Sequence, residues 1–206
     1  ITGLGSSDTN ALNQNTDFAS GVAVLGTGQP NNLKYTGLIG TYQFMAKAQS
    51  SPTTLTGAAN VQILIGPLEY FRMFKAGSLS TPWESPQRNA KTFTVSPVIG
   101  AFDAGDNPIT SYNANSSPVT FTTNSPTGNG AIAGLGSGNN NVLSRSSDFV
   151  NGYATLGAGQ TNALKYTGQL GTFTFGASGG GKNHLAPVTL QILPGDIDHF
   201  HLVFAS

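Results

Sequence analysis

The chain has 206 residues, of which only 9% are charged, and its nine basic and nine acidic residues give a formal net charge of zero. Average globular proteins carry roughly a quarter charged residues, so this composition excludes a basic nucleic-acid-binding face and an acidic tail. Cysteine is absent, which excludes a disulfide framework and a thiol nucleophile. The longest apolar runs have the length of strands, so we expect no membrane insertion.

Uncharged polar residues must supply the solubility of this chain, since Asn, Ser, Thr, Gln and Gly far outnumber the charged residues. Such a surface responds weakly to salt and pH, and it lacks the charge repulsion that keeps proteins monomeric. We therefore expect a secreted protein of the cell exterior whose partners are other copies of itself, with glycans as a second class of partner. The first residue is Ile1, so either a leader is removed from the mature chain or the sequence is a piece of a longer polypeptide.

The two ends of the chain are copies of each other. Residues 3–44 align with residues 134–175 at a constant offset of 131, and 23 of the 42 positions are identical. After a two-residue gap, VQILIGPLEYF (61–71) aligns with LQILPGDIDHF (190–200). A repeat of this length indicates a tandem architecture, so function is expected in an array rather than in one catalytic pocket.

Strands are predicted along most of the chain, because apolar and polar residues alternate with period two in stretches rich in β-branched and aromatic residues. These stretches are 93–95, 119–122, 171–175, 188–192 and 199–204. The 27 Gly and 11 Pro residues break helices frequently, and the one helix candidate, at 71–76, is too short to stand alone. The pattern favours an all-β sandwich.

Several repeated side chains are predicted to be structural. The tetrad KYTG occurs at 34–37 and again at 165–168; its tyrosine fits a corner in which the hydroxyl bonds the backbone, and a contact to glycans or a neighbouring subunit is the functional alternative. The pair Asp-Phe at 17–18 and 148–149 is typical of a turn acceptor followed by a core residue. The predicted core positions are Leu33, Tyr35, Phe44, Leu164, Tyr166 and Phe175.

The order of motifs between residues 66 and 195 points to a fold. It opens with GPLEYF at 66–71, continues with FDAGDNPITSY at 102–112, and runs through VTFT, NGYAT and GTFTF. This order resembles the bacterial Ig-like (Big-type) domains found in tandem on prokaryotic cell-surface proteins. The resemblance implies Ig-like β-sandwich modules in tandem, here with internally repeated halves. The repeat is longer than the usual module, so residues 124–147 form an extra hairpin or a long loop.

The same phasing divides the chain unevenly. Residues 67–195 hold one complete module, with the second copy of the repeat at 131–195. Residues 1–66 match only the second half of a module, and residues 196–206 match only its first strand. A half sandwich exposes an apolar face and unpaired strand edges, which is costly.

Three arrangements would remove this cost: a longer array, a self-contained domain at 1–66 with a twin at 131–193, or addition of the C-terminal strand of one subunit to the N-terminal domain of the next. We favour completion by the array or by another subunit, since a head-to-tail contact propagates without closing. The inserted row is then Phe200, Leu202 and Phe204, or His199, His201 and Val203 on the opposite face.

One cation site is a candidate. Asp103, Asp106 and Asn107 have closely spaced oxygen donors that would suit Ca²⁺ at the edge of a sandwich. The same DAGDN sequence, followed by Pro108, is also typical of a turn in which Asp and Asn bond their own backbone. No other cofactor is expected.

Two further residues are candidates for contact with carbohydrate. Trp83, which lies between prolines, is either an exposed residue that stacks on a glycan or a side chain packed over the end of the sandwich. Asn115 begins the sequence Asn-Ser-Ser in a predicted loop and is a candidate N-glycosylation acceptor.

The chain is not expected to be an enzyme, because it offers neither a GxSxG elbow nor a recognisable Ser/His/Asp set. Our first hypothesis is a structural subunit of an extracellular filament, a surface layer or an adhesin stalk, assembled by β-strand complementation and lateral packing of Ig-like domains. The alternatives are a carbohydrate- or receptor-binding module that uses residues 124–147 and Trp83, and a virion fibre or capsid decoration protein.

Overall fold

The computed structural model describes residues 1–48, 57–78, 83, 86–94 and 97–197. The chain divides into two compact units, residues 1–64 and residues 65–206. In the described residues the secondary structure is almost entirely β, and the helical content is one turn of 3₁₀ helix, η1 (Asn129–Ala131). The first unit contains β1 (Gly40–Phe44) and β2 (Ala59–Ile63), which pair with each other in antiparallel register.

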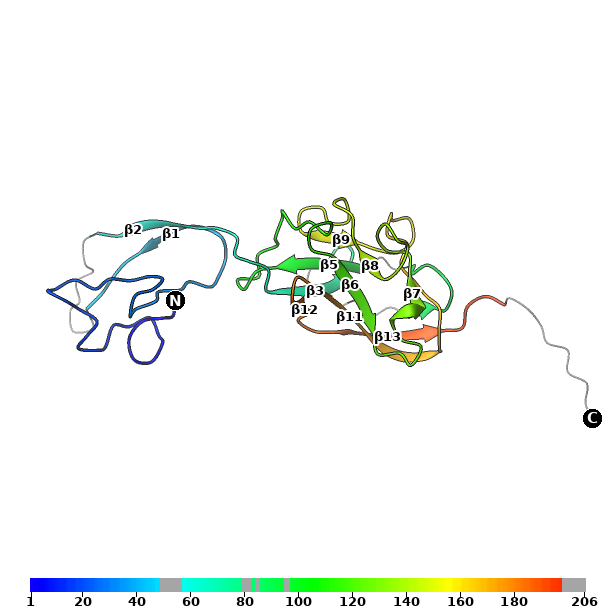
Figure 1. Ribbon diagram of the computed structural model, residues 1–206, viewed down its shortest axis with the longest axis horizontal. Coiled ribbons are helices and arrows are strands. Elements are labelled where there is room, and N and C mark those ends of the chain that lie inside the picture. The colour runs from blue at the N-terminus through cyan, green and yellow to red at the C-terminus, as the bar shows by residue number, and fades with distance from the viewer. Residues whose placement is uncertain (49–56, 79–82, 84–85, 95–96, 198–206) are drawn as a thin grey trace, which may run out of the picture. The chain divides into compact units, whose positions relative to one another are not determined.

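The described part of the second unit contains eleven strands in several sheets, and Figure 1 labels most of them. The strands are β3 (Tyr70–Lys75), β4 (Gln87–Arg88), β5 (Pro97–Phe102), β6 (Val119–Thr123), β7 (Ile132–Ala133), β8 (Val142–Leu143), β9 (Tyr153–Thr155), β10 (Lys165–Tyr166), β11 (Gly171–Gly179), β12 (Lys182–Asn183) and β13 (Val188–Leu193). One sheet has the order β4-β13-β11-β6-β8, with β12 on β11, and a second has the order β3-β5-β9. A short β10-β7 pair completes the set.

A single large apolar core joins the two main sheets of the second unit. Phe71 and Met73 reach it from β3, Phe121 from β6 and Phe175 from β11, and all four are buried. Alternation of side chains along each strand explains this, since residues two apart face the same side of a sheet. Two sheets that share one core are compatible with a β-sandwich.

A second, smaller cluster lies on β3 and β5, where Phe74, Val98 and Phe102 are buried together with partly buried Tyr70 and Tyr153. Gly100 on β5 makes this packing possible, because a Cβ atom there would collide with the ring of Phe102. Both surfaces of β5 are therefore covered, in agreement with the complete burial of its six residues.

Three sequence predictions of strands are confirmed and two other predictions are wrong. β6, β11 and β13 cover the stretches 119–122, 171–175 and 188–192. The helix candidate at 71–76 is wrong because this segment forms β3, whose alternating burial is that of a strand. The stretch 93–95 is not a strand where it is described; Phe93 is buried in irregular backbone. The stretch 199–204 lies outside the described residues.

For residues 124–147 the sequence predicts either an extra hairpin or a long loop, and the structure shows short paired segments. β7 pairs with β10, and β8 pairs with β6. Leu135 and Asn140 form a further isolated bridge. This region therefore adds short strands to the second unit instead of forming one long unstructured loop.

Candidate assembly face

The hairpin of the first unit has the same register as its repeat in the second unit. Gly40 pairs with Ile63 and Phe44 with Ala59, and likewise Gly171 pairs with Ile192 and Phe175 with Val188. The sequence alignment places these pairs at equivalent positions. The two copies therefore build the same local strand pair.

A buried pair of polar side chains, Asp and Asn, also recurs in both copies. The side-chain amide of Asn31 donates to Asp17 at 3.2 Å, and that of Asn162 donates to Asp148 at 3.1 Å. In each copy the Asn carbonyl accepts a backbone N–H, from Gly5 at 2.9 Å and from Gly136 at 3.0 Å. These bonds fix the loop that leads into the tyrosine tetrad.

The second copy adds a charge to this network. Arg145, which replaces Gln14 of the first copy, pairs with Asp148 at 2.9 Å and donates to Asn162 at 2.7 Å. Burial by itself raises the pKa of Asp148, but hydrogen bonds from Arg145, Asn162 and Ser144 outweigh it and lower the pKa below its ordinary value. The carboxylate of Asp148 is thus held ionised and oriented.

Burial, in contrast to local geometry, differs sharply between the copies. Phe18 is 54% exposed whereas its counterpart Phe149 is 6% exposed, and Leu25 is 42% exposed whereas Leu156 is fully buried. Among the described residues of the first unit, Leu4 is the one large apolar side chain that is buried. Burying one exposed Leu or Phe side chain stabilises a fold by roughly 1.5–3 kcal/mol. Covering these side chains would therefore add substantially to the stability of the first unit.

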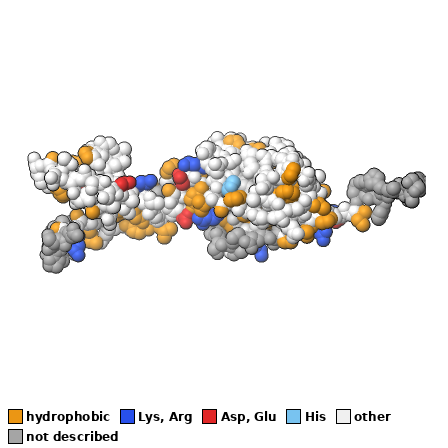
Figure 2. All heavy atoms as spheres, turned by 90° about the horizontal axis from the view of Figure 1, so that it is seen from below, with side chains coloured by type: hydrophobic (Ala, Val, Ile, Leu, Met, Phe, Trp, Pro, Cys, Tyr) orange, Lys and Arg blue, Asp and Glu red, His pale blue; other side chains and the backbone are white. Residues whose placement is uncertain are grey.

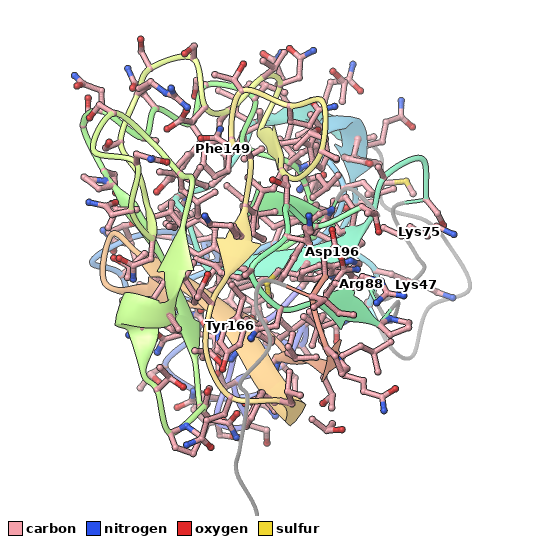
Figure 3. The ribbon with its side chains drawn as sticks, turned by 90° about the vertical axis from the view of Figure 1, so that its right-hand side faces the viewer. Lys47, Lys75, Arg88, Phe149, Tyr166 and Asp196 are labelled. Atoms are coloured by element: carbon pink, nitrogen blue, oxygen red, sulfur yellow. The ribbon has the colours of Figure 1, made fainter. Side chains whose placement is uncertain are left out.

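We call eight aligned residues of the first unit, all between positions 18 and 63, the exposed half-core; each of them matches a core residue of the second unit. In the second unit every counterpart is buried in the main core. In the first unit all members are exposed or only partly buried. The exposed half-core comprises Phe18, Ala23, Leu25, Leu33, Tyr35, Phe44, Val61 and Ile63. Figure 3 shows Phe149 and Tyr166, the buried counterparts of Phe18 and Tyr35.

The expected core is therefore half confirmed. Leu164, Tyr166 and Phe175 are fully buried, as predicted. The prediction is wrong for Leu33, Tyr35 and Phe44, which are only partly buried. The strands and rings that cover Leu164, Tyr166 and Phe175 come from residues 65–131. The described part of the first unit contains no equivalent segment, and this explains the difference.

Aromatic contacts show how the cover works. In the second unit the ring of Phe175 lies 6.3 Å from that of Phe93, 5.9 Å from that of Phe121 and 5.8 Å from that of Tyr166. Among the described residues of the first unit, the ring of Phe44 has an aromatic contact with Tyr35 of the same copy, with centroids 5.9 Å apart.

Backbone hydrogen bonds also hold the cover in place. The N–H of Phe93 donates to Leu164, the N–H of Leu156 donates to Pro97, and the N–H of Thr167 donates to Ala131, at 2.7–2.9 Å. β6 extends the hairpin on the side of β11, and β4 extends it on the side of β13. In the described part of the first unit, β1 and β2 form a sheet of two strands. Both of its strands are therefore edge strands, which readily accept another strand.

Charge does not protect the exposed half-core. Its members are all uncharged, and Figure 2 shows blue and red side chains as few and scattered among white and orange ones. A hollow of about 390 Å³ in the first unit, next to Gly3, Asp8 and Lys34, is polar and lined by exposed side chains. The apolar surface is the more distinctive feature of this unit.

At the calcium candidate the hydrogen bonds describe a turn. Asp103 accepts N–H groups from Gly66, Gly105 and Asn107 at 2.8–3.0 Å. Burial raises the pKa of Asp103, yet these bonds together lower it below its ordinary value. Asp106 is turned to Arg72, with which it forms an ion pair at 2.9 Å. Donors of N–H bonds thus occupy the carboxylates, and the described residues contain no group of three or more acidic or histidine side chains suited to a metal ion.

Trp83 is buried, so its interpretation as an exposed glycan-stacking residue is wrong in this structure. Its ring packs on Phe93 with centroids 5.3 Å apart, and both belong to the main core. Asn115 is exposed in a turn after Asn113, whose side chain accepts its N–H. Asn115 is therefore accessible, and glycosylation there stays a prediction.

The repeated tyrosine behaves as the structural interpretation predicts in the second copy. The hydroxyl of Tyr166 bonds the side chain of Ser125 and donates to the carbonyl of Gln169 at 3.2 Å. The proposed inserted row, Phe200, Leu202 and Phe204, lies outside the described residues. So do His199, His201 and Val203.

No helix in the described part of the chain is long and apolar enough to cross a membrane. The exposed half-core was not named as a site from the sequence, although a signal existed. The first copy keeps an apolar residue at every position that forms the core in the second copy, including Val61, which is the counterpart of Leu190.

The sequence matches no known protein-family model, and no curated protein is significantly similar to it.

Proposed function

We propose that the protein is a structural subunit of an extracellular filament, a surface layer or an adhesin stalk, in which Ig-like modules in tandem associate with other copies. The exposed half-core carries the proposal, because core-type apolar side chains that are exposed or only partly buried are typical of an interaction surface. The scarcity of charge supports it, since uncharged faces pack side by side without repulsion.

The role proposed is mechanical and needs no catalytic group. Strand ladders and apolar contacts between modules carry the load, and the polar loops keep the assembly hydrated. Burial of Trp83 removes one of the two features on which the carbohydrate- or receptor-binding alternative rests, the other being residues 124–147. We therefore place assembly ahead of recognition.

Negative-stain microscopy and light scattering of the protein purified from its natural source, over a wide concentration range, test the proposal. We expect fibres or sheets that persist when the salt concentration is raised, because apolar burial and not charge drives the contact. Particles that remain single, unassembled chains at every concentration would contradict it.

A further inference from the structure

We propose that the exposed half-core of the first unit is the docking site for a polypeptide segment of the kind formed by residues 65–131, supplied by another module. The inference deepens the proposed function and rests on it, by naming the partner through which modules join.

The second unit contains the bound form of this pairing. Residues 65–131 lie on the second copy through β6, β4, Phe93 and Phe121. The first copy presents the same hairpin register and the same polar pair, Asp17 and Asn31. Its apolar residues occupy the positions that this segment contacts. A segment that fits one copy therefore fits the other.

Exchange of segments between two chains would not cover the exposed half-core, because second halves of modules outnumber first halves. Residues 1–206 include two second halves, at 1–64 and 132–193, and one first half, at 65–131. Within the chain that first half already covers the second copy. Swapping first halves between two chains leaves the same number of second halves uncovered. The occupant must be an additional first half.

The chemistry of the occupant follows from the contacts. It needs aromatic rings equivalent to Phe93 and Phe121 to cover Phe44, because these rings cover Phe175. It needs backbone equivalent to Phe93 and Pro97 to bond Leu33 and Leu25, whose counterparts make these bonds.

A single C-terminal strand does not meet this requirement. Residues 199–204 align with β3, and β3 pairs with β5 and not with the hairpin of the second copy. Residues 194–206 thus carry only the beginning of a first half. Strand addition by Phe200, Leu202 and Phe204 alone would leave Phe44 without its rings.

The test is a gain of cover in the full chain. A second copy of residues 65–131 is placed directly ahead of Ile1, so that it joins the first copy as residue 131 joins residue 132 in the chain. Hydrogen exchange is then measured by mass spectrometry on peptides from residues 18–44 at low protein concentration. We expect exchange to slow by at least about tenfold, since buried, bonded backbone opens rarely.

The matched control carries Phe93→Ser and Phe121→Ser in the added segment only, which leaves the second unit untouched. Exchange in residues 18–44 should then remain as fast as in the unextended chain. A second readout guards against an added segment that fails to fold: Leu25→Ala should destabilise the extended chain as much as Leu156→Ala does, and the unextended chain far less.

Two results would overturn the proposal. One is unchanged exchange together with an unchanged effect of Leu25→Ala in the extended chain. The other is protection of residues 18–44 in the unextended chain that grows with concentration in a closed dimer, which would mean that the face pairs with itself. Microscopy of the protein from its natural source scores the proposed function separately. Protection without fibres or sheets keeps the docking site and removes the function, and fibres without protection do the reverse.

Discussion

The loop around Asp17 and the loop around Asp148 have matching hydrogen bonds, and the strands that follow have matching register, yet one copy is largely exposed and the other is buried. The comparison separates two sources of structure. Polar side chains and turns set the local path of the chain from within the copy. Apolar coverage is set by a segment remote in the sequence, and in the described residues such a segment covers the second copy.

The glycine at the start of each copy illustrates the local source. Gly3 and Gly134 both have positive φ, at 87° and 91°, and a Cβ atom at either position would collide with a backbone carbonyl, of Asn32 or of Ala163. Only glycine adopts this path without strain. Because the constraint lies inside the copy, it is satisfied whether or not the apolar face is covered.

The largest expected difference in stability between the copies concerns their central aromatic rings, Phe175 and Phe44. Phe175→Ala should lower the free energy of unfolding of the second unit by about 3–5 kcal/mol, because it opens a cavity among three rings. Phe44→Ala, the matched variant, should cost well under half as much. Chemical denaturation followed by hydrogen exchange in each unit measures both, and equal losses would show that the first face is already covered in the free chain.

The next largest expected effect is a loss of stability of the second unit at low pH. The pKa values of Asp103 and Asp148 are lowered in the folded protein, so as pH falls the unfolded chain takes up these protons first. Their stabilisation is therefore complete above the ordinary carboxyl pKa of about 4 and is lost as pH falls through the lower, folded-state values.

Asp148→Asn tests the assignment of this acid sensitivity. At neutral pH the variant should cost about 1–3 kcal/mol, because Arg145 and two backbone N–H groups lose their charged acceptor. It should also flatten the loss of stability of the second unit as the pH falls below the ordinary carboxyl pKa of about 4. Denaturation midpoints across this range measure both effects. An unchanged acid limb in the variant would mean that other groups control it.

Much of the local structure could be predicted from the sequence, because its causes are local. β11 and β13 follow from alternation, and the tyrosine corner at Tyr166 follows from a repeated motif. β3 was mistaken for a helix candidate because YFRMFK is nearly continuous in apolar residues, and period alone does not separate a buried strand from a helix.

Burial could not be predicted in the same way, since it depends on which segment lies opposite. The sequence leaves Trp83 either exposed or packed over the end of the sandwich, and the structure buries it against Phe93 in the main core. Leu33 and Leu164 both precede Lys-Tyr-Thr-Gly in the sequence and differ in exposure. Sequence identity between repeats therefore predicts conformation better than it predicts environment.

The smallest expected difference concerns one hydroxyl group. Tyr166→Phe should destabilise the second unit by about 1 kcal/mol, because it removes the bonds to Ser125 and to the carbonyl of Gln169. Tyr35→Phe should cost the first unit clearly less, because the hydroxyl of Tyr35 bonds the side chain of Tyr42, outside a buried core, and the segment that would supply the counterpart of Ser125 is not part of that unit. If an added first half docks as proposed, the effect of Tyr35→Phe should rise to that of Tyr166→Phe in thermal unfolding of the extended chain. A difference that persists after docking would mean that the tyrosine hydroxyl is bonded in the second copy for reasons unrelated to its cover.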